Sequence, residues 1–170
     1  MRTVIFLDID GVLNCDETQE KCGGFRGIED GKVSLLKEIV DLVNGEIILS
    51  STWRYGFSKN SPDWARGLSE YLKGKLEKQG LKISGMTPDI NCTQRGKEIK
   101  LWLDTNGKAD KVIILDDEEF DWEGLEDKWI CTTDTHTMYP GLSRKHVEYI
   151  RENVGQFDYS PGEGPKISTL

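Results

Sequence analysis

Two aspartates at the end of an apolar segment have a spacing that suits metal-assisted chemistry. Asp8 and Asp10 are separated by one residue, and residues two apart on an extended backbone project to the same side. Their carboxylates can therefore face one point in space, where they repel each other unless a cation lies beside them. Asp116 and Asp117 follow a second apolar segment and would complete an all-oxygen pocket of the kind that Mg²⁺ prefers. We predict a Mg²⁺ site that takes ligands from Asp8, Asp10, Asp116 and Asp117.

A divalent cation beside two carboxylates favours phosphoryl transfer. The cation screens a phosphate, so that one carboxylate can attack phosphorus and form an aspartyl-phosphate. The second carboxylate, two residues on, can protonate the leaving oxygen and later activate water. The other phosphate oxygens need a hydroxyl, from Ser50 or Ser51, and a positive charge, from Arg95 or Lys97. A single Asp after a strand is common in solvated loops, but paired acids after two apolar segments favour a shared site.

The segments that must position these residues alternate between strand and helix patterns. Apolar, β-branched runs predict buried strands over 3–7, 47–49, 81–86, 112–115 and 129–132. Apolar residues at helical spacing predict helices over 33–43, 63–79, 93–106 and 144–154. This alternation predicts a three-layer, Rossmann-like α/β fold, with a five-stranded parallel sheet and helices on both faces. Ligands of such sheets gather at the carboxyl ends of the strands, where the acids and serines stand.

Length and composition describe one acidic globular domain. The chain has 170 residues, a formal net charge of −8 and a sequence pI near 4.9, which argues against broad, sequence-independent nucleic-acid binding. No apolar run approaches the roughly 20 residues needed to cross a bilayer, and the four cysteines have no disulfide or zinc-ligand spacing. We therefore expect a cytoplasmic protein with no membrane contact. The domain is predicted over 1–154, with 155–170 as a flexible tail or extended strap.

Four segments, in this order, resemble the motifs of haloacid dehalogenase (HAD) phosphohydrolases. They are FLDIDGV at 6–12, IILSS at 47–51, RGKEI at 95–99 and IILDD at 113–117. The resemblance implies that Asp8 is the nucleophile and a Mg²⁺ ligand, and that Asp10 is the acid and base, with its carbonyl on the metal. It also implies that Asp116 is the remaining protein ligand, with Asp117 in support.

The same resemblance bears on the phosphate-binding residues. Ser51 fits the second motif best because it precedes Thr52 and Trp53, as in relatives whose motif ends in Ser or Thr, any residue and Trp. Ser50 remains an alternative. Arg95 fits relatives in which a basic residue precedes a glycine and a helix, and Lys97 remains an alternative because lysine is the commoner residue in that motif.

A closer resemblance links the chain to the HAD domains of multidomain RNA-repair proteins of the Swiss Army Knife type. It rests on SSTWR at 50–54, the RG-x-EI-x-x-WL helix from residue 95, ILDDE at 114–118 and Gly-Leu-Ser at 141–143. Those domains are thought to be polynucleotide or nucleotide phosphatases, so the resemblance implies a phosphorylated nucleic-acid terminus or nucleotide as substrate.

The spacing of the motifs leaves little room for a cap domain over the site. The predicted helices and strands fill the intervals between motifs, apart from a polar segment over 14–31 that we interpret as a loop or small flap. With a minimal cap or none, the pocket stays open. An open pocket favours a terminal phosphate on a polymer, such as a nucleic-acid end, or an exposed nucleotide.

Residues near the second motif could contact such a substrate. The segment 54–111 is more basic than the rest of the chain, and Trp53, Tyr55, Phe57 and Trp64 stand at or near its start. Each aromatic alone also fits the core, and the lysines fit a solvated helix face. The alternative functions are a small-metabolite phosphatase, a HAD-fold binding module without turnover, and a receiver-like signalling domain, which the Asp-x-Asp pair disfavours.

Overall fold

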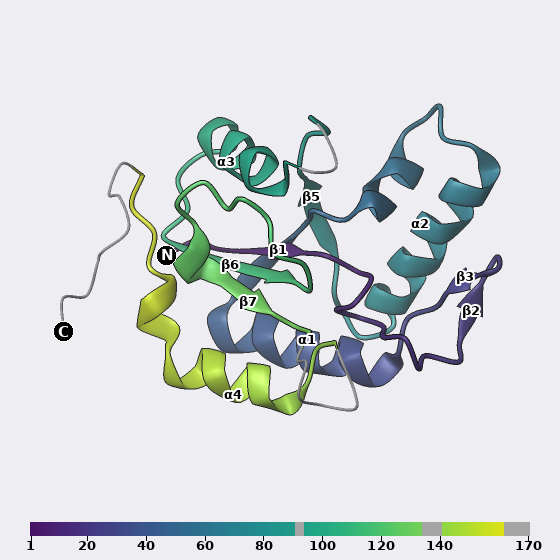
Figure 1. Ribbon diagram of the computed structural model, residues 1–170, viewed down its shortest axis with the longest axis horizontal. Helices are drawn as coiled ribbons and strands as arrows, with labels where there is room; N and C mark the ends of the chain where they lie inside the picture. Colours follow the sequence, from purple (N-terminus) through teal and green to yellow (C-terminus); the bar gives the residue numbers. More distant parts are fainter. Residues whose placement is uncertain (91–93, 134–140, 162–170) are drawn as a thin grey trace.

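The computed structural model describes residues 1–90, 94–133 and 141–161 (Figure 1). Five parallel strands form its central sheet in the order β5-β4-β1-β6-β7. They are β1 (Thr3–Leu7), β4 (Gly45–Leu49), β5 (Ile83–Met86), β6 (Lys111–Asp116) and β7 (Trp129–Cys131). Each overlaps a segment whose apolar pattern predicts a strand, and the all-parallel sheet confirms the predicted fold class.

Helices cover both faces of this sheet. They are α1 (Asp30–Val43), α2 (Asp63–Glu77), α3 (Arg95–Thr105) and α4 (Arg144–Glu152). Side chains of α1, α2 and α4 pack with Ile5 and Leu7 in one core, and those of α3 pack with Val4 and Phe6 in another. Successive residues of β1 thus point into two cores, as those of a strand buried on both faces do. Within the described residues, no helix combines the length and the apolar character needed to span a bilayer.

Shorter elements connect the main ones. An antiparallel hairpin of β2 (Lys21–Cys22) and β3 (Phe25–Arg26) forms within the predicted flap, and Figure 1 shows it beside α2. Three short 3₁₀ helices are η1 (Thr52–Phe57), η2 (Glu126–Lys128) and η3 (Val154–Phe157). The sequence patterns did not predict these short elements, because each has too few residues to show a periodicity.

The segment predicted as a tail or strap begins with residues that pack on the domain. Phe157 is fully buried in the core beside α1 and α4. The Tyr159 amide donates to the Asp110 carbonyl oxygen at 2.8 Å, next to the bridge between Lys111 and Asp158. Residues 155–157 are therefore part of η3 rather than extended, and residues 158 and 159 are held beside the start of β6. Residues 162–170 lie outside the described residues, and the division of the chain at 154 stays a prediction.

The chain between the predicted motifs is used by the core fold itself. The described residues between Asp10 and Ser51 form the hairpin, α1 and β4, and those between Ser51 and Arg95 form η1, α2 and β5. Because α1, α2 and the two strands all contribute to the central cores, the small hairpin is the only regular element left over among the described residues of these intervals. The carboxyl edge of β1 and β6 therefore carries a flap rather than an inserted domain.

Candidate active site

Three carboxylates meet at the carboxyl ends of two adjacent strands. Asp8 directly follows β1, and Asp116 is the last residue of β6, with which β1 pairs. Asp8 and Asp116 are buried and Asp117 is half-buried. One oxygen of each lies within 4.8 Å of one oxygen of the other two. The close register of these parallel strands thus brings together acids that are more than a hundred residues apart in the chain.

Burial and mutual repulsion make this cluster a poor place for several negative charges. The pKa of Asp116 is raised to about 8 by burial and by the charge of Asp8. Burial and the negative charge of Asp8 also raise the pKa of Asp117, to about 6. Burial also raises the pKa of Asp8, and hydrogen bonds and attraction from Arg95 offset this only in part. A cation at the cluster would relieve the repulsion.

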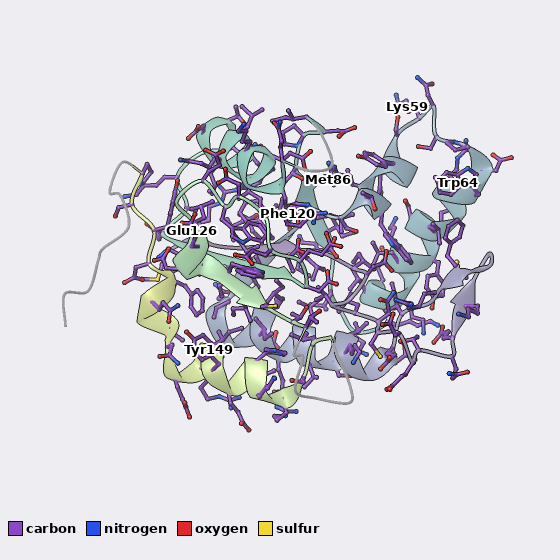
Figure 2. The ribbon with its side chains drawn as sticks, in the orientation of Figure 1. Lys59, Trp64, Met86, Phe120, Glu126 and Tyr149 are labelled. Carbon is purple, nitrogen blue, oxygen red and sulfur yellow. The ribbon has the colours of Figure 1, made fainter. Side chains whose placement is uncertain are left out.

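A buried guanidinium joins two of the three acids. Arg95 is the first residue of α3, and its Nη1 lies 3.0 Å from Asp8 Oδ1 and 2.8 Å from Asp116 Oδ2. Its guanidinium also lies over the ring of Phe120, 5.1 Å from the centroid, in the region of the molecule where Figure 2 labels that ring. Gly96 makes the approach of α3 possible, since a Cβ there would stand 2.1 Å from the Asp121 carbonyl oxygen.

Lys97, the other candidate cation, lies apart from the acids. Its side chain is about half exposed, and its Nζ is 3.9 Å from Glu123 Oε1. Residues two apart on a helix point in nearly opposite directions, because each residue turns by about 100°. The buried side of α3 therefore brings Arg95 to the carboxylates and leaves Lys97 on the outer surface.

The two candidate serines stand at the end of β4, next to β1. Ser50 is fully buried, and its Oγ has no hydrogen-bond partner within the described part of the chain. Ser51 is also buried, and its Oγ accepts from the Trp53 amide at 3.4 Å. A hydrogen bond with the Ser51 side chain also lowers the pKa of Asp8. Both serines thus belong to the same strand-end region as the acids, and the Ser50 hydroxyl is a buried polar group without a partner among the described residues.

Asp10 has a different environment from the three clustered acids. Its Oδ1 accepts from Asn14 Nδ2 at 2.9 Å, and its Oδ2 accepts from the indole Nε1 of Trp53 at 2.9 Å. Asn14 in turn accepts from the Gly11 amide at 2.9 Å. Gly11 has φ +75°, and a Cβ there would stand 2.1 Å from Asp117 Oδ2. The turn after β1 therefore holds the Asp10 carboxylate beside the cluster rather than in it.

Comparison with known protein families agrees with this arrangement. Residues 4–147 match the family model described as the HAD domain in Swiss Army Knife RNA repair proteins. The chain belongs to this family. No curated protein and no solved structure matches the chain. The matched range includes all the predicted site residues, so the resemblance of the four motifs is confirmed at the level of the family.

The HAD domain also contains a buried ion pair that the motifs did not predict. Arg54 Nη2 lies 3.0 and 2.9 Å from the two carboxylate oxygens of Glu98, and Arg54 Nη1 donates to the carbonyl oxygens of Ser50 and Ser51 at 2.8 and 3.1 Å. Glu98 is fully buried on α3. The pair therefore fixes the serine-bearing loop to the helix that carries Arg95.

Sequence reasoning missed two further groups in this HAD domain. Asn14 holds Asp10, although the sequence marked it only as part of a polar segment. Trp53 was considered as a platform for a base, but it is buried and donates to Asp10. A helix-face argument was available for Glu98, which lies three residues after Arg95 and four before the buried Trp102. No comparable pattern identifies Asn14, and the motif that includes Trp53 marks the residue without indicating its contact with Asp10.

Proposed function

We propose that this HAD domain is a Mg²⁺-dependent phosphomonoester hydrolase that acts through an aspartyl-phosphate on Asp8. The observation that carries the proposal is the contact of one guanidinium, that of Arg95, with both Asp8 and Asp116. A buried cation beside a nucleophilic carboxylate gives a phosphate dianion a counter-charge at the point of attack. The family assignment supports the same chemistry.

The residues present fit a hard divalent cation. Asp8, Asp116 and Asp117 offer carboxylate oxygens within 4.8 Å of one another, an all-oxygen donor set of the type that suits Mg²⁺. These residues would hold the ion, together with the backbone carbonyl of Asp10. When bound, Mg²⁺ would neutralise part of the charge of the acids and of the phosphate.

The protein's own residues would then carry two steps. In the first, an Asp8 oxygen attacks phosphorus, the bond from phosphorus to the leaving oxygen breaks, and Asp10 gives its proton to that oxygen. In the second, Asp10 takes a proton from water, the water oxygen attacks phosphorus, and the bond to Asp8 breaks to release inorganic phosphate. Arg95 and the hydroxyls of Ser50 and Ser51 would hold the phosphate oxygens throughout.

A nucleic-acid end or a nucleotide is the proposed substrate. The described residues between the motifs supply only a small hairpin at the open edge of the site, so a long chain that carries the phosphate has room to leave the pocket. The family takes its description from RNA repair proteins, which favours a nucleic-acid end over a small metabolite as the carrier of the phosphate. A small-metabolite phosphatase and a binding module without turnover are the alternatives.

The test compares the Asp8→Asn variant with a matched variant, Asp104→Asn, which makes the same change at an exposed position of α3. With Mg²⁺ and a panel of 3′-phosphorylated oligonucleotides, 5′-mononucleotides and sugar phosphates, we expect Asp8→Asn to lose at least about a thousandfold in kcat/KM. Asp104→Asn should retain wild-type rates, and chelation of divalent ions should stop turnover.

Each alternative has its own outcome in this experiment. Persistent turnover by Asp8→Asn would exclude Asp8 as the nucleophile, and persistence in chelator would exclude the metal. A sugar phosphate preferred by orders of magnitude would favour the metabolite phosphatase. Absence of turnover by the wild-type protein on the whole panel would favour the binding module.

A further inference from the structure

A cavity of about 340 Å³ opens beside Asp10, on the side of the site formed by the hairpin, η1 and α2. Its walls include Trp53 and Tyr55 of η1, Trp64 of α2 and Phe25 of β3. Among the described residues that line it, Asp10 alone carries a charge. The cavity is at the small end of the range for ligand pockets in proteins, and its volume suits a single ring system.

Three of the aromatic rings around this cavity are left open to solvent. Phe25 is 46% exposed, Tyr55 38% and Trp64 60%. Single exposed hydrophobic residues are ordinary on protein surfaces, but these three come from three different elements and surround one cavity. The rings of Phe25 and Trp64 are stacked, with centroids 5.6 Å apart and planes inclined by 25°. A planar ligand could extend this stack without displacing it.

The wall that carries Phe25 is fixed to α2. Tyr71 Oη donates to Glu20 Oε1 at 2.6 Å, and Lys75 Nζ donates to Glu20 Oε2 and Asp30 Oδ1, each at 2.9 Å. Lys75 is buried by these contacts. The hairpin is thus held against the helix that carries Trp64, so the cavity exists before a ligand binds and little ordering is needed on binding.

We propose that this cavity is the leaving-group subsite and that it holds a nucleobase stacked on Trp64 and Phe25. The inference rests on the proposed function, in which Asp10 gives a proton to the leaving oxygen. Because Asp10 lines the cavity, the group attached to that oxygen is directed into it. A neutral, planar, aromatic group matches walls that are aromatic and almost uncharged, whereas a second phosphate or a bare sugar does not.

The experiment measures how much the base contributes to catalysis. Adenosine 3′-monophosphate and adenosine 5′-monophosphate are each compared with the same sugar phosphate without the base, and the ratio of the two kcat/KM values is determined. Base stacking on an aromatic side chain contributes about 5- to 150-fold in binding, so we expect a ratio of at least about 5 for one isomer. The Trp64→Ala variant should reduce that ratio to about 2 or less, and Trp64→Phe should restore most of it.

Tyr149→Ala is the matched control. Tyr149 is an aromatic residue of α4 that is 42% exposed, and Figure 2 shows it at the opposite side of the molecule from Trp64. Its loss should leave the ratio at the wild-type value. A wild-type ratio near one for both isomers, or a ratio that Trp64→Ala does not lower, would overturn the subsite. An equal gain in kcat/KM over the sugar phosphate with cyclohexyl phosphate, whose leaving group is a bulky aliphatic alcohol, would also overturn the subsite. That result would show that the cavity accepts any apolar group.

A second measurement separates this inference from the proposed function. The affinities of adenosine monophosphate and of the sugar phosphate are measured by calorimetry for Asp8→Asn and for the double variant Asp8→Asn/Trp64→Ala. This measurement requires no turnover. If the wild-type protein hydrolyses nothing, the proposed function fails, while a base-dependent affinity that Trp64 controls still supports the subsite. If turnover occurs but the affinity ratio is near one in both variants, the subsite fails and the proposed function stands.

Discussion

The Trp53→Phe variant tests whether the indole of Trp53 positions Asp10 for proton transfer. The substitution keeps an aromatic ring at a buried position but removes the Nε1–H that donates to Asp10 Oδ2 at 2.9 Å. A hydrogen bond to a charged group contributes about 1.5–3 kcal/mol. Because 1.36 kcal/mol corresponds to a tenfold change in rate, complete loss of this contribution in the transition state would lower kcat/KM by about 10- to 150-fold. The remaining bond from Asn14 to Oδ1 keeps the effect below that of removing Asp10.

The dependence on leaving group makes this prediction specific. An alkyl phosphate requires a proton on its leaving oxygen, whereas p-nitrophenolate leaves readily without one, so the general acid matters only for the first. We therefore expect Trp53→Phe to lose about 10- to 150-fold in kcat/KM with an alkyl phosphate and less than about threefold with p-nitrophenyl phosphate. Steady-state assays of both substrates measure the difference.

Trp122→Phe is the control for the loss of volume. Trp122 is buried like Trp53, but its Nε1 has no hydrogen-bond acceptor within the described residues. The Trp122→Phe variant should change the rates with both substrates by the same small factor. Equal losses with the two substrates in Trp53→Phe would refute the argument, because they would show that Trp53 acts through the fold and not through the proton on Asp10.

Two further predictions concern the acid cluster. The pKa values of Asp116, about 8, and Asp117, about 6, lie above the ordinary value of 3.8. The folded state therefore binds protons more tightly than the unfolded chain. Without a cation, these two groups lower the free energy of unfolding as the pH rises from about 4 to about 8. Millimolar Mg²⁺ should therefore raise Tm more at pH 8 than at pH 5 in thermal unfolding, and equal increments would contradict the assignment. Gly11→Ala should abolish the Mg²⁺-dependent rise in Tm, because its Cβ would displace the Asp117 carboxylate. Gly124→Ala is the control, since Gly124 has φ +86° and open space around it. This variant should lower the free energy of unfolding in urea by about 1–2 kcal/mol and retain the Mg²⁺ effect. An intact Mg²⁺ effect in Gly11→Ala would show that Asp117 is not a ligand.

The strands and the acids at their ends could be predicted because both depend on local pattern. Each apolar run marks a strand buried on both faces, and an Asp at its end marks the edge where parallel strands place ligands. The choice between Arg95 and Lys97 needed one more step. Arg95 shares a helix face with the buried Ile99 and Trp102, four and seven residues later, and this spacing was present in the sequence.

The supporting contacts could not be predicted in the same way. Trp53 and Asp10 are 43 residues apart, and Arg54 and Glu98 are 44 apart. Their pairing depends on the register of β1 against β4 and on the angle at which α3 meets the sheet, which no local pattern determines. The hairpin was missed as a hairpin for another reason, since its strands have two residues each and show no alternation.

The buried pair of Arg54 and Glu98 bears on the phosphate recognition that we propose for the site. Burying two charges costs more than their attraction returns unless the geometry is good and further hydrogen bonds satisfy them. Here Nη2 of Arg54 contacts both carboxylate oxygens of Glu98, and Nη1 donates to the carbonyls of Ser50 and Ser51, whereas Nε of Arg54 has no acceptor among the described residues. The pair therefore makes one rigid unit of the serine loop and of the helix that begins with Arg95. On the opposite side, Lys75 and Glu20 fix the wall of the cavity. Because both sides are held in place by contacts within the protein, the proposed function implies that substrates are selected by what the fixed cavity accepts rather than by the closing of a cap.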